Sequence, residues 1–418
     1  MTTHDSGTDS RRHIGFLSSS LSLGTVFAAA GSPVSLYETY RLQDGIDTGQ
    51  LAVVAASYFI AVAVALLFFG RISDHLGRRP VAFAALGFAA AGCLLMLDVH
   101  TAVPLVVGRA LQGLGGGLAS SAVTAYIVDT APTKPAWLAS VVTGTVPMFG
   151  LPAGAVLSGA LVQYGPAPRV LIYLVIVALL VMCAVLVALS PETVSRVPGA
   201  TRTIRPHISV PRNSRRVLPY AAAVIVGTWV MGSFYQAFGP AVADDQFGTT
   251  NALIAATVFA SIMLLNPLGG LLTGLLSPAR KQRLGMAVFL AAIIAVVINL
   301  ATGATVPFLI GSLIAGAGWG AAFSGSVQSL LHGTDPQDRA GTLAAVYLIS
   351  YSSAAIPGLL AGAFTHTLTL LQTALAMSAV TLICSVFTLI ATREPGPRPS
   401  ESRASDDHEP KRGIRSPR

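Results

Sequence analysis

Charged residues are scarce in this sequence, and their scarcity sets the class of protein. Asp, Glu, Lys and Arg together make up 11% of the 418 residues, whereas 53% of the residues are hydrophobic. A soluble protein carries about 25% charged residues. With so little polar surface the chain cannot stay in water, and we expect an integral membrane protein embedded in the lipid bilayer.

Residues suited to catalysis or metal binding are also few. The three cysteines, Cys93, Cys183 and Cys384, lie far apart inside apolar runs and lack the spacing of metal ligands or of a disulfide framework. The sequence has no P-loop and no visible grouping of serine, histidine and aspartate. We therefore expect no enzymatic activity, no cofactor, no metal and no direct use of ATP.

The basic residues outnumber the acidic ones, 26 to 18, which gives a formal net charge of +8. Such a balance indicates nucleic-acid binding when the basic residues form a patch with interleaved aromatics. Here they stand between apolar runs, so we expect no nucleic-acid partner. Cytoplasmic loops of membrane proteins carry an excess of Lys and Arg, and this explains the charge.

Long apolar runs fill most of the chain, and a membrane-spanning helix needs about 20 such residues. The first run resembles a signal peptide, because Arg11 and Arg12 precede it and Ala28 to Ala30 mimic a cleavage site. It is long enough to span, and we interpret it as a retained helix. The runs predict an all-α integral membrane fold of twelve transmembrane helices. They lie near 15–37, 50–69, 80–98, 102–127, 137–161, 169–190, 218–239, 251–276, 284–302, 306–331, 340–363 and 369–391.

The basic residues predict how the chain crosses the membrane. If the N-terminus is cytoplasmic and the runs alternate, the cytoplasmic segments hold 23 Lys and Arg residues and the outer loops hold only Arg41 and Arg169. The remaining basic residue, Arg109, lies inside a run. The positive-inside rule then places both termini in the cytoplasm and the chain, as a multi-pass protein, in the cell inner (plasma) membrane.

The longest loop between runs divides the chain into two halves of six helices. This loop, 191–217, holds six arginines and one acidic residue, Glu192. The tail after Arg393 is rich in Pro, Ser and charge, which is typical of disorder. We predict a cytoplasmic N-tail at 1–14, a six-helix half at 15–190, a basic cytoplasmic linker at 191–217, a second six-helix half at 218–391 and a disordered cytoplasmic C-tail at 392–418.

The turn between the second and third runs reads Gly70-Arg71-Ile72-Ser73-Asp74-His75-Leu76-Gly77-Arg78-Arg79. Its first glycine, the aspartate four residues later and the Gly-Arg-Arg ending resemble the loop between helices 2 and 3 of the major facilitator superfamily. Arg109 with Gln112, Gly113 and Gly115 to Gly117 resembles the fourth-helix motif of that family, and Pro191-Glu192-Thr193 is a further match. The resemblance implies two six-helix halves with inverted three-helix repeats. It points most to the twelve-helix drug:proton antiporter branch.

The resemblance also implies that the turn acts as a conformational latch, which holds the cytoplasmic face closed in the outward-open conformation. Gly70 is expected to pack on the eleventh helix, where Asp74 meets free N–H groups near Ala340 to Leu343. Arg78 is expected to pair with Asp129. In the alternative interpretation, the arginines of the turn only set topology and hold lipid phosphates. The predicted latch residues are Gly70, Asp74, Gly77, Arg78, Arg79 and Asp129.

Proton coupling usually needs charged or titratable groups inside the bundle, and these are rare here. Arg109 is a functional candidate because an arginine within a span costs roughly 2.5–3.5 kcal/mol to insert. The resemblance links it to proton coupling, whereas the alternative is a structural arginine bonded to carbonyls of a neighbouring helix. Glu38, at the outer end of the first run, is the candidate proton site or else a solvated loop residue.

The fifth run contains prolines and glycines that make a helix easy to bend, which suits a gate. It resembles the antiporter motif of the family, although Leu151 separates Gly150 from Pro152 and Ala155 stands where glycine is usual. The predicted gating residues are Gly144, Pro147, Gly150, Pro152 and Gly154.

A substrate site is expected near the midplane between the halves. Aromatic and amide walls, with one arginine and no central acid, favour an apolar or anionic organic compound over a sugar or a metal cation. Each candidate wall residue could instead serve helix–helix contact. The candidates are Tyr58, Gln112, Met148, Trp229, Tyr235, Gln236, Trp319, Gln328, Tyr347 and Tyr351.

Together these patterns predict a monomeric secondary transporter that uses inward proton flow to export a small, drug-like organic compound by alternating access. Its partners are that compound, protons and the lipid bilayer. Uptake of a small metabolite by proton symport is the alternative within transport. A membrane enzyme or a polytopic sensor is the alternative from another class, but the sequence shows neither convergent catalytic groups nor an added soluble domain.

Overall fold

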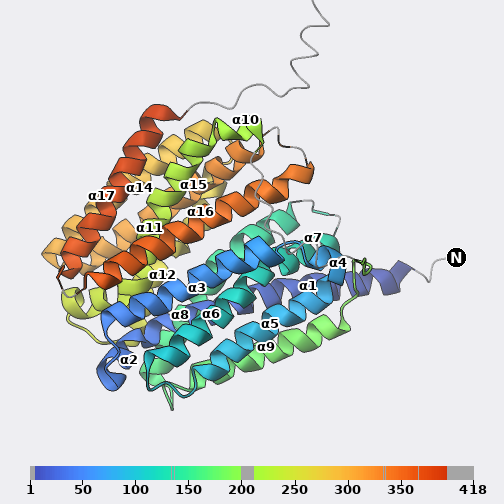
Figure 1. Ribbon diagram of the computed structural model, residues 1–418, viewed down its shortest axis with the longest axis horizontal. Coiled ribbons are helices and arrows are strands. Elements are labelled where there is room, and N and C mark those ends of the chain that lie inside the picture. The colour runs from blue at the N-terminus through green and yellow to red at the C-terminus, as the bar shows by residue number, and fades with distance from the viewer. Residues whose placement is uncertain are drawn as a thin grey trace, which may run out of the picture.

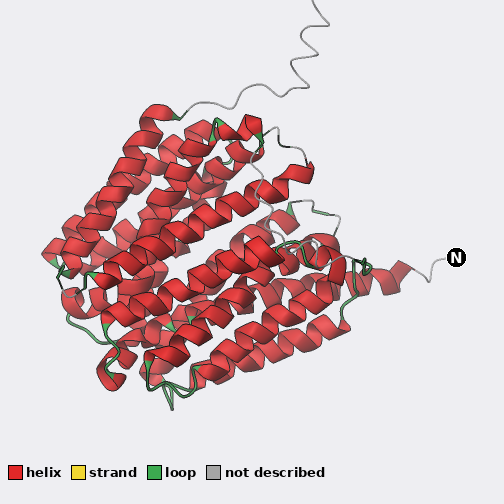
Figure 2. Ribbon diagram, viewed as in Figure 1, coloured by secondary structure: helices red, strands yellow, loops and turns green. Residues whose placement is uncertain are grey.

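The fold is helical throughout the described part of the chain (Figure 2). The computed structural model describes residues 5–132, 134–135, 137–198, 211–332, 334, 336–365 and 367–392. Within these residues, twelve helical segments are long and apolar enough to cross a membrane, which confirms the predicted twelve-span fold. The predicted disordered tail beyond Thr392 and the middle of the predicted linker, 199–210, lie outside the described residues.

The first six spans are built from α1 to α9 and two short irregular turns. These are α1 (Asp5–Gly31), the 3-10 turn η1 (Val34–Leu36), α2 (Tyr37–Asp44), α3 (Thr48–Phe69), α4 (Ser73–Leu76), α5 (Arg78–Leu95), α6 (Ala102–Leu118), the π-helical turn η2 (Ala119–Val123), α7 (Thr124–Thr130), α8 (Leu138–Tyr164) and α9 (Leu171–Leu189). The short α4 forms the turn that joins the second and third spans.

The last six spans follow the short α10 (Arg212–Arg215). They are α11 (Leu218–Phe247), α12 (Ala252–Leu264) with α13 (Asn266–Leu272), α14 (Pro278–Thr302), α15 (Thr305–Leu331), α16 (Pro336–Ala363) and α17 (Leu370–Ala391). In Figure 1 the helices of the two halves form two groups side by side, and α3 packs on α16 while α8 packs on α12.

Three spans differ in detail from the predicted straight runs. The first is interrupted after Gly31 and continues through α2 to Asp44, beyond the predicted end at residue 37. The fourth contains the π-helical turn η2. The eighth is broken between α12 and α13, because Pro267 has no N–H to donate to the preceding turn.

Local capping explains where several helices begin and end. The Asp47 side chain accepts a hydrogen bond from Gln50 N at 2.9 Å, and the Gln50 side chain accepts one from Asp47 N at 3.1 Å. Thr369 and Gln372 form the same capping box at the start of α17. Gly248 and Gly303 end their helices at positive φ, a conformation that glycine adopts without strain.

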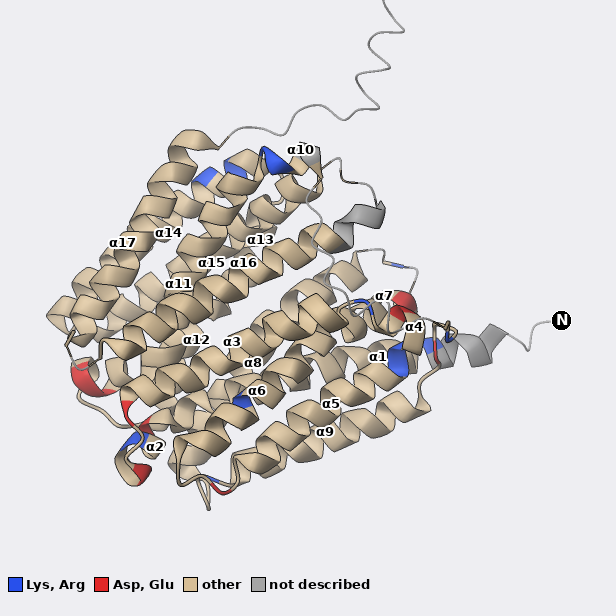
Figure 3. Cartoon of the chain, in the orientation of Figure 1, with Lys and Arg blue, Asp and Glu red and all other residues tan. Residues whose placement is uncertain are grey.

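Most charged residues of the described chain lie at the two ends of the bundle (Figure 3). We call the end that carries α4 and α10 the basic end, because the arginines of the 70–79 turn and of α10 lie there. We call the opposite end the α2 end. It holds Glu38, Asp44 and Asp244, with Arg41 and Arg169 bound to them.

Candidate substrate cavity and the turn at its mouth

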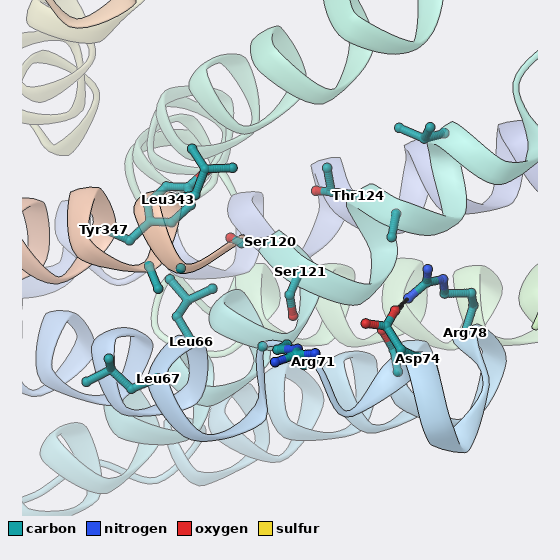
Figure 4. A pocket seen from close by; sticks show the side chains of 16 residues that line it. Leu66, Leu67, Arg71, Asp74, Arg78, Ser120, Ser121, Thr124, Leu343 and Tyr347 are labelled. Atoms are coloured by element: carbon teal, nitrogen blue, oxygen red, sulfur yellow. Dashed lines mark hydrogen bonds and ion pairs between the residues drawn. The ribbon is translucent and has the colours of Figure 1, made fainter. Parts of the chain in front are cut away.

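A cavity with two compartments lies between the halves. The outer compartment, of about 490 Å³, is walled by α3, α4, η2 and α7 on one side and by α16 on the other (Figure 4). The inner compartment is about 290 Å³. Ser120, Thr124 and Tyr347 line both compartments, so the two adjoin. The side chain of Asp74 at the rim is 51% exposed, and the cavity is therefore reached from the basic end.

Aromatic rings from the second half form much of the inner compartment. The ring of Trp229 lies edge-on to Trp319, with centroids 5.8 Å apart, and edge-on to Tyr351 at 5.1 Å. Tyr347 stacks on Tyr351 at 6.3 Å. Five of the ten predicted wall residues line this compartment, and two predicted gating residues join them. The seven are Met148, Trp229, Trp319, Tyr347, Tyr351, Gly144 and Pro147.

The other five predicted wall residues are not among the described lining residues, and four of them make contacts inside the bundle. Gln112 accepts from Arg109 at 3.2 Å, and Tyr58 lies beneath the same guanidinium. The Tyr235 hydroxyl is 2.5 Å from Ser312 Oγ, and Gln328 accepts from Lys281 Nζ at 3.1 Å. The fifth, Gln236, is buried on α11.

Sequence analysis missed several residues of the inner wall. They are Phe27, Ser120, Thr124, Thr143, Asn266 and Phe323. For two of them the sequence carried a signal. Asn266 is an amide beside a proline that breaks an apolar run, and Ser120 belongs to a pair of serines inside another run. That second run forms a π-helical turn in the structure, a feature that occurs frequently at functional sites.

Arg109 is fully buried on α6, outside the described lining of the cavity. Its Nη1 donates to the carbonyl of Ala30 on α1 and to Gln112 Oε1. The guanidinium carbon lies 4.5 Å from the centroid of the Tyr58 ring. Within the described residues its Nε and Nη2 have no hydrogen-bond partner. This is the geometry of the structural alternative, an arginine that joins two helices, and a role in proton coupling stays a prediction.

Glu38 lies at the α2 end and is buried rather than solvated. Arg41 Nη2 is 2.6 Å from Glu38 Oε1 and 3.1 Å from Asp244 Oδ2. Asp244 belongs to α11, so the arginine joins the two halves at this end. Glu38 and Asp244 share the Arg41 guanidinium, and this arrangement forms only while the two halves are close together at this end.

The predicted pairing of Arg78 with Asp129 is present at the basic end. Arg78 Nε donates to Asp129 Oδ2 at 3.0 Å. Arg78 Nη1 donates to Asp74 Oδ1 at 2.6 Å (Figure 4). The same nitrogen donates to Ser73 Oγ at 2.6 Å. Arg78 therefore ties the turn to the end of α7 within the first half.

Gly70 and Asp74 face the second half across the outer compartment. They line it together with Gly341 and Leu343 of α16, the region predicted to receive Asp74. A β-carbon built on Gly70 would meet only its own helix, at Leu66 O, so Gly70 does not pack on α16 in this conformation. The basic end is open here, and the contact with α16 stays a prediction for the conformation in which this end is closed.

The α2 end is closed by close backbone contacts between the halves. A β-carbon built on Gly159 of α8 would lie 2.6 Å from Ala252 O and 2.8 Å from the Ala256 side chain on α12. One built on Gly49 of α3 would lie 2.9 Å from Gly362 O on α16. The glycines thus let these helices meet more closely than side chains would allow.

The predicted gating glycines of α8 divide between two surroundings. Gly144 lines the cavity, whereas Gly150 packs on α1, where its built β-carbon would lie 2.8 Å from Gly24 O. Gly154 also packs on α1, against the backbone of Ala28, and Pro152 is buried. Gly150 and Gly154 thus let α8 pack closely on α1 in this conformation.

A clamp that sequence analysis left without a role holds the 70–79 turn from the other side. The carboxylate of Glu192, in the Pro191-Glu192-Thr193 motif, accepts from Arg78 N at 2.8 Å and from Arg79 N at 3.0 Å. These N–H groups begin α5, where a helix favours a negative charge. Gly77 makes room for the carboxylate: it has a φ of 96°, and a β-carbon there would lie 2.6 Å from Glu192 Oε2.

Replacing Glu192 with glutamine is expected to lower the free energy of unfolding by about 1 kcal/mol. The substitution replaces one acceptor oxygen with an amide NH2 group, which faces backbone N–H groups and cannot accept hydrogen bonds from them. Thermal unfolding of the purified protein measures the change. The control is Asp98→Asn at the α2 end, whose side chain is 88% exposed and should contribute little. Equal melting temperatures for the two variants would contradict the clamp.

Comparison with known proteins adds a family and several partial relatives. The sequence model of the Major Facilitator Superfamily matches residues 14–359. Multidrug resistance protein MdtL of Klebsiella pneumoniae is 34% identical over 86 residues, 21% of this chain and 22% of that protein. Putative multidrug resistance protein MdtD of Klebsiella pneumoniae is 31% identical over 113 residues, 27% of this chain and 24% of that protein.

A third relative is named for a different activity. The vacuolar membrane amino acid uptake transporter fnx2 of Schizosaccharomyces pombe is 32% identical over 117 residues, 27% of this chain and 20% of that protein. The chain thus matches about a fifth to a quarter of the length of these relatives.

Proposed function

Because the chain belongs to the Major Facilitator Superfamily of membrane transporters, we propose that it exports small organic compounds in exchange for protons by alternating access. The observation that carries the proposal is the cavity between the halves, open at the basic end and closed at the α2 end. Names of two partial relatives, MdtL and MdtD, support efflux of drug-like compounds. The proposed working unit is a monomer.

The proposed orientation places the basic end and both termini in the cytoplasm, with the chain in the cell inner membrane. The distribution of Lys and Arg supports it, since 23 of the 26 basic residues fall on that side. The open basic end then admits a compound from the cytoplasm. The compound leaves after the halves have closed this end and opened the α2 end.

The latch proposed at 70–79 works in the second of these conformations. Closing the basic end brings Asp74 toward the start of α16, whose N–H groups and positive dipole end favour a carboxylate. Arg78, held by Asp129 and Asp74, and the Glu192 clamp keep the turn in position for that contact. Gly70 allows α3 to approach α16.

Proton coupling is proposed to involve Glu38 and Arg109. Opening the α2 end separates Arg41 from Asp244 and gives external protons access to the Glu38 carboxylate. Arg109 lies deeper, on α6, and joins that helix to α1, which precedes the segment with Glu38. Protonation of Glu38 is therefore expected to alter how α1 and α6 pack in the first half.

Proton-coupled uptake of a small metabolite is the second candidate, and the name of fnx2, an amino acid uptake transporter, favours uptake. The same cavity could serve either direction, because alternating access is reversible. The direction in which a proton gradient drives the compound distinguishes the two.

The test uses everted membrane vesicles with an acidic interior, followed with a pH-sensitive dye. We expect at least one compound from a panel of neutral, anionic and cationic aromatics to release protons from vesicles that contain the protein and not from empty ones. A protonophore should abolish transport of that compound. Transport that survives collapse of the gradient contradicts proton coupling, and proton-driven uptake of an amino acid or sugar into right-side-out vesicles, without any antiport signal, favours the symporter.

A further inference from the structure

We propose that Asn266 is the hydrogen-bonding group of the inner compartment, and that this compartment takes an uncharged planar aromatic compound with a carbonyl group. The inference rests on the proposed function, since it narrows the class of transported compound. It is carried by the position of Asn266, by its lack of a partner and by the absence of charge around it.

Asn266 stands at the break in the eighth span. α12 ends at Leu264 and α13 begins at Asn266, followed directly by Pro267. Irregular backbone at membrane depth is tolerated where it is buried in protein or lines a cavity, and transporters often form their sites from such broken helices. Asn266 lines the inner compartment, so this break meets that description.

The backbone of Asn266 is held firmly against α15. A β-carbon built on Gly320 would collide with the Asn266 backbone, and one built on Gly316 would collide with the Ile262 carbonyl. α15 also places Trp319 and Phe323 in the wall of the same compartment. The backbone that carries the Asn266 side chain is thus fixed in position relative to the aromatic wall.

The Asn266 side chain forms no hydrogen bond with the described part of the chain, although it can both donate and accept. Two hydroxyl groups of the same wall, those of Ser120 and Thr143, already have partners. Ser120 Oγ donates to Gly116 O at 2.8 Å, and Thr143 Oγ1 donates to Ala139 O at 2.9 Å. Trp229 Nε1 in the same wall also has no partner within the described residues, but an indole N–H can only donate. The Asn266 amide can donate and accept at once, so it can bind a group that carries both a carbonyl and an N–H.

The rest of the inner compartment defines the remainder of the compound. Its described lining holds no Asp, Glu, Lys or Arg, so a charged compound would lose its hydration without gaining a counter-charge. Trp229, Trp319 and Tyr351 offer ring edges and faces to a flat ring system. A volume of about 290 Å³ suits a few fused rings.

The test compares four three-ring probes of similar size on the purified full-length protein in nanodiscs. Acridone is neutral and has a carbonyl and an N–H, anthracene has neither, 10-methylacridinium is a cation and anthracene-9-carboxylate is an anion. Binding is read from quenching of tryptophan emission. Of the three tryptophans, Trp137 lies outside the described cavity lining and is replaced by phenylalanine, which leaves the signal to Trp229 and Trp319.

We expect acridone to bind more tightly than the other three probes. Asn266→Leu, which keeps the side-chain size, should weaken acridone binding about five- to tenfold and change anthracene binding less than twofold. Asn299→Leu is the matched control, because the Asn299 amide bonds only to Ala295 O of its own helix, at 2.7 Å, and should leave both affinities unchanged.

Three results would overturn the proposal: acridone binding no tighter than anthracene, tighter binding of either ion, or equal weakening of acridone and anthracene by Asn266→Leu. The last would mean that Asn266 only supports the wall. The proposed transport function is tested separately by proton release from vesicles. Selective binding of acridone without proton-linked transport would refute the transport function and leave the assignment of Asn266 standing. Proton-linked transport in which Asn266 plays no part would refute the assignment of Asn266 and leave the transport function standing.

Discussion

Replacing Asp74 with asparagine is expected to lower proton-linked transport about tenfold without changing the orientation of the chain. The substitution removes one negative charge and leaves every Lys and Arg in place, so the positive-inside signal persists. It weakens the 2.6 Å ion pair with Arg78 and removes the carboxylate that would meet the N-terminus of α16 in the closed conformation. The conformation with a closed basic end then loses roughly 1.4 kcal/mol, which corresponds to a tenfold change.

The measurement is the initial rate of proton release from everted vesicles, using the panel compound with the largest wild-type signal. Asp47→Asn is the matched control. It makes the same change of charge at the α2 end, and asparagine caps a helix as well as aspartate does. If Asp74→Asn transports at the wild-type rate, the turn does not act as a latch, and its arginines serve topology and lipid binding only.

Replacing Gly159 with leucine is expected to drive the protein out of the described conformation. The built β-carbon lies 2.6 Å from Ala252 O and 2.8 Å from the Ala256 side chain, both on the other half, so a larger side chain does not fit while the α2 end is closed. Overpacking of this kind costs about 1–3 kcal/mol. Because the contact is between halves, separation of the halves at this end relieves the overlap without unfolding either half.

Cysteine labelling measures this change without knowledge of the transported compound. In a variant whose three native cysteines are replaced by alanine, Thr124→Cys places a thiol in the cavity wall. We expect a membrane-impermeant maleimide, added at the basic end, to label it at least fivefold more slowly once Gly159→Leu is present. Gly87→Leu is the control, since a β-carbon on Gly87 meets nothing within 4 Å. Unchanged labelling in Gly159→Leu would show that the α8–α12 contact does not separate when the basic end closes.

The sequence predicted the fold well because the bilayer imposes a simple rule on composition. A backbone in hydrocarbon must satisfy its own hydrogen bonds, so each run of about 20 apolar residues forms a helix. The breaks were harder to predict. Pro147 and Pro152 lie inside the continuous α8, whereas Pro267 separates α12 from α13, and packing on neighbouring helices decides between these outcomes.

The site was predicted only in part, since a residue at mid-depth can face the cavity, a neighbouring helix or lipid. Trp229 and Trp319 line the cavity as predicted, while Tyr235 and Gln328 bond to other helices. All four are aromatic or amide residues within runs. Membrane helices carry apolar residues on all sides, so the sequence does not show which face of a helix each residue occupies. For this reason Asn266 was not foreseen as a wall residue.

What the sequence by itself determined is the class of protein, the number of spans and the local chemistry of the 70–79 turn. These follow from composition, run length and short-range spacing, which act within one or two helices. Only the tertiary structure decided that the basic end is open, that Glu192 holds the turn, that Arg109 bonds to α1 and that Asn266 faces an uncharged cavity unpaired. Each of these depends on which helix faces which, and that choice is made by glycine contacts and side-chain packing between segments far apart in the chain.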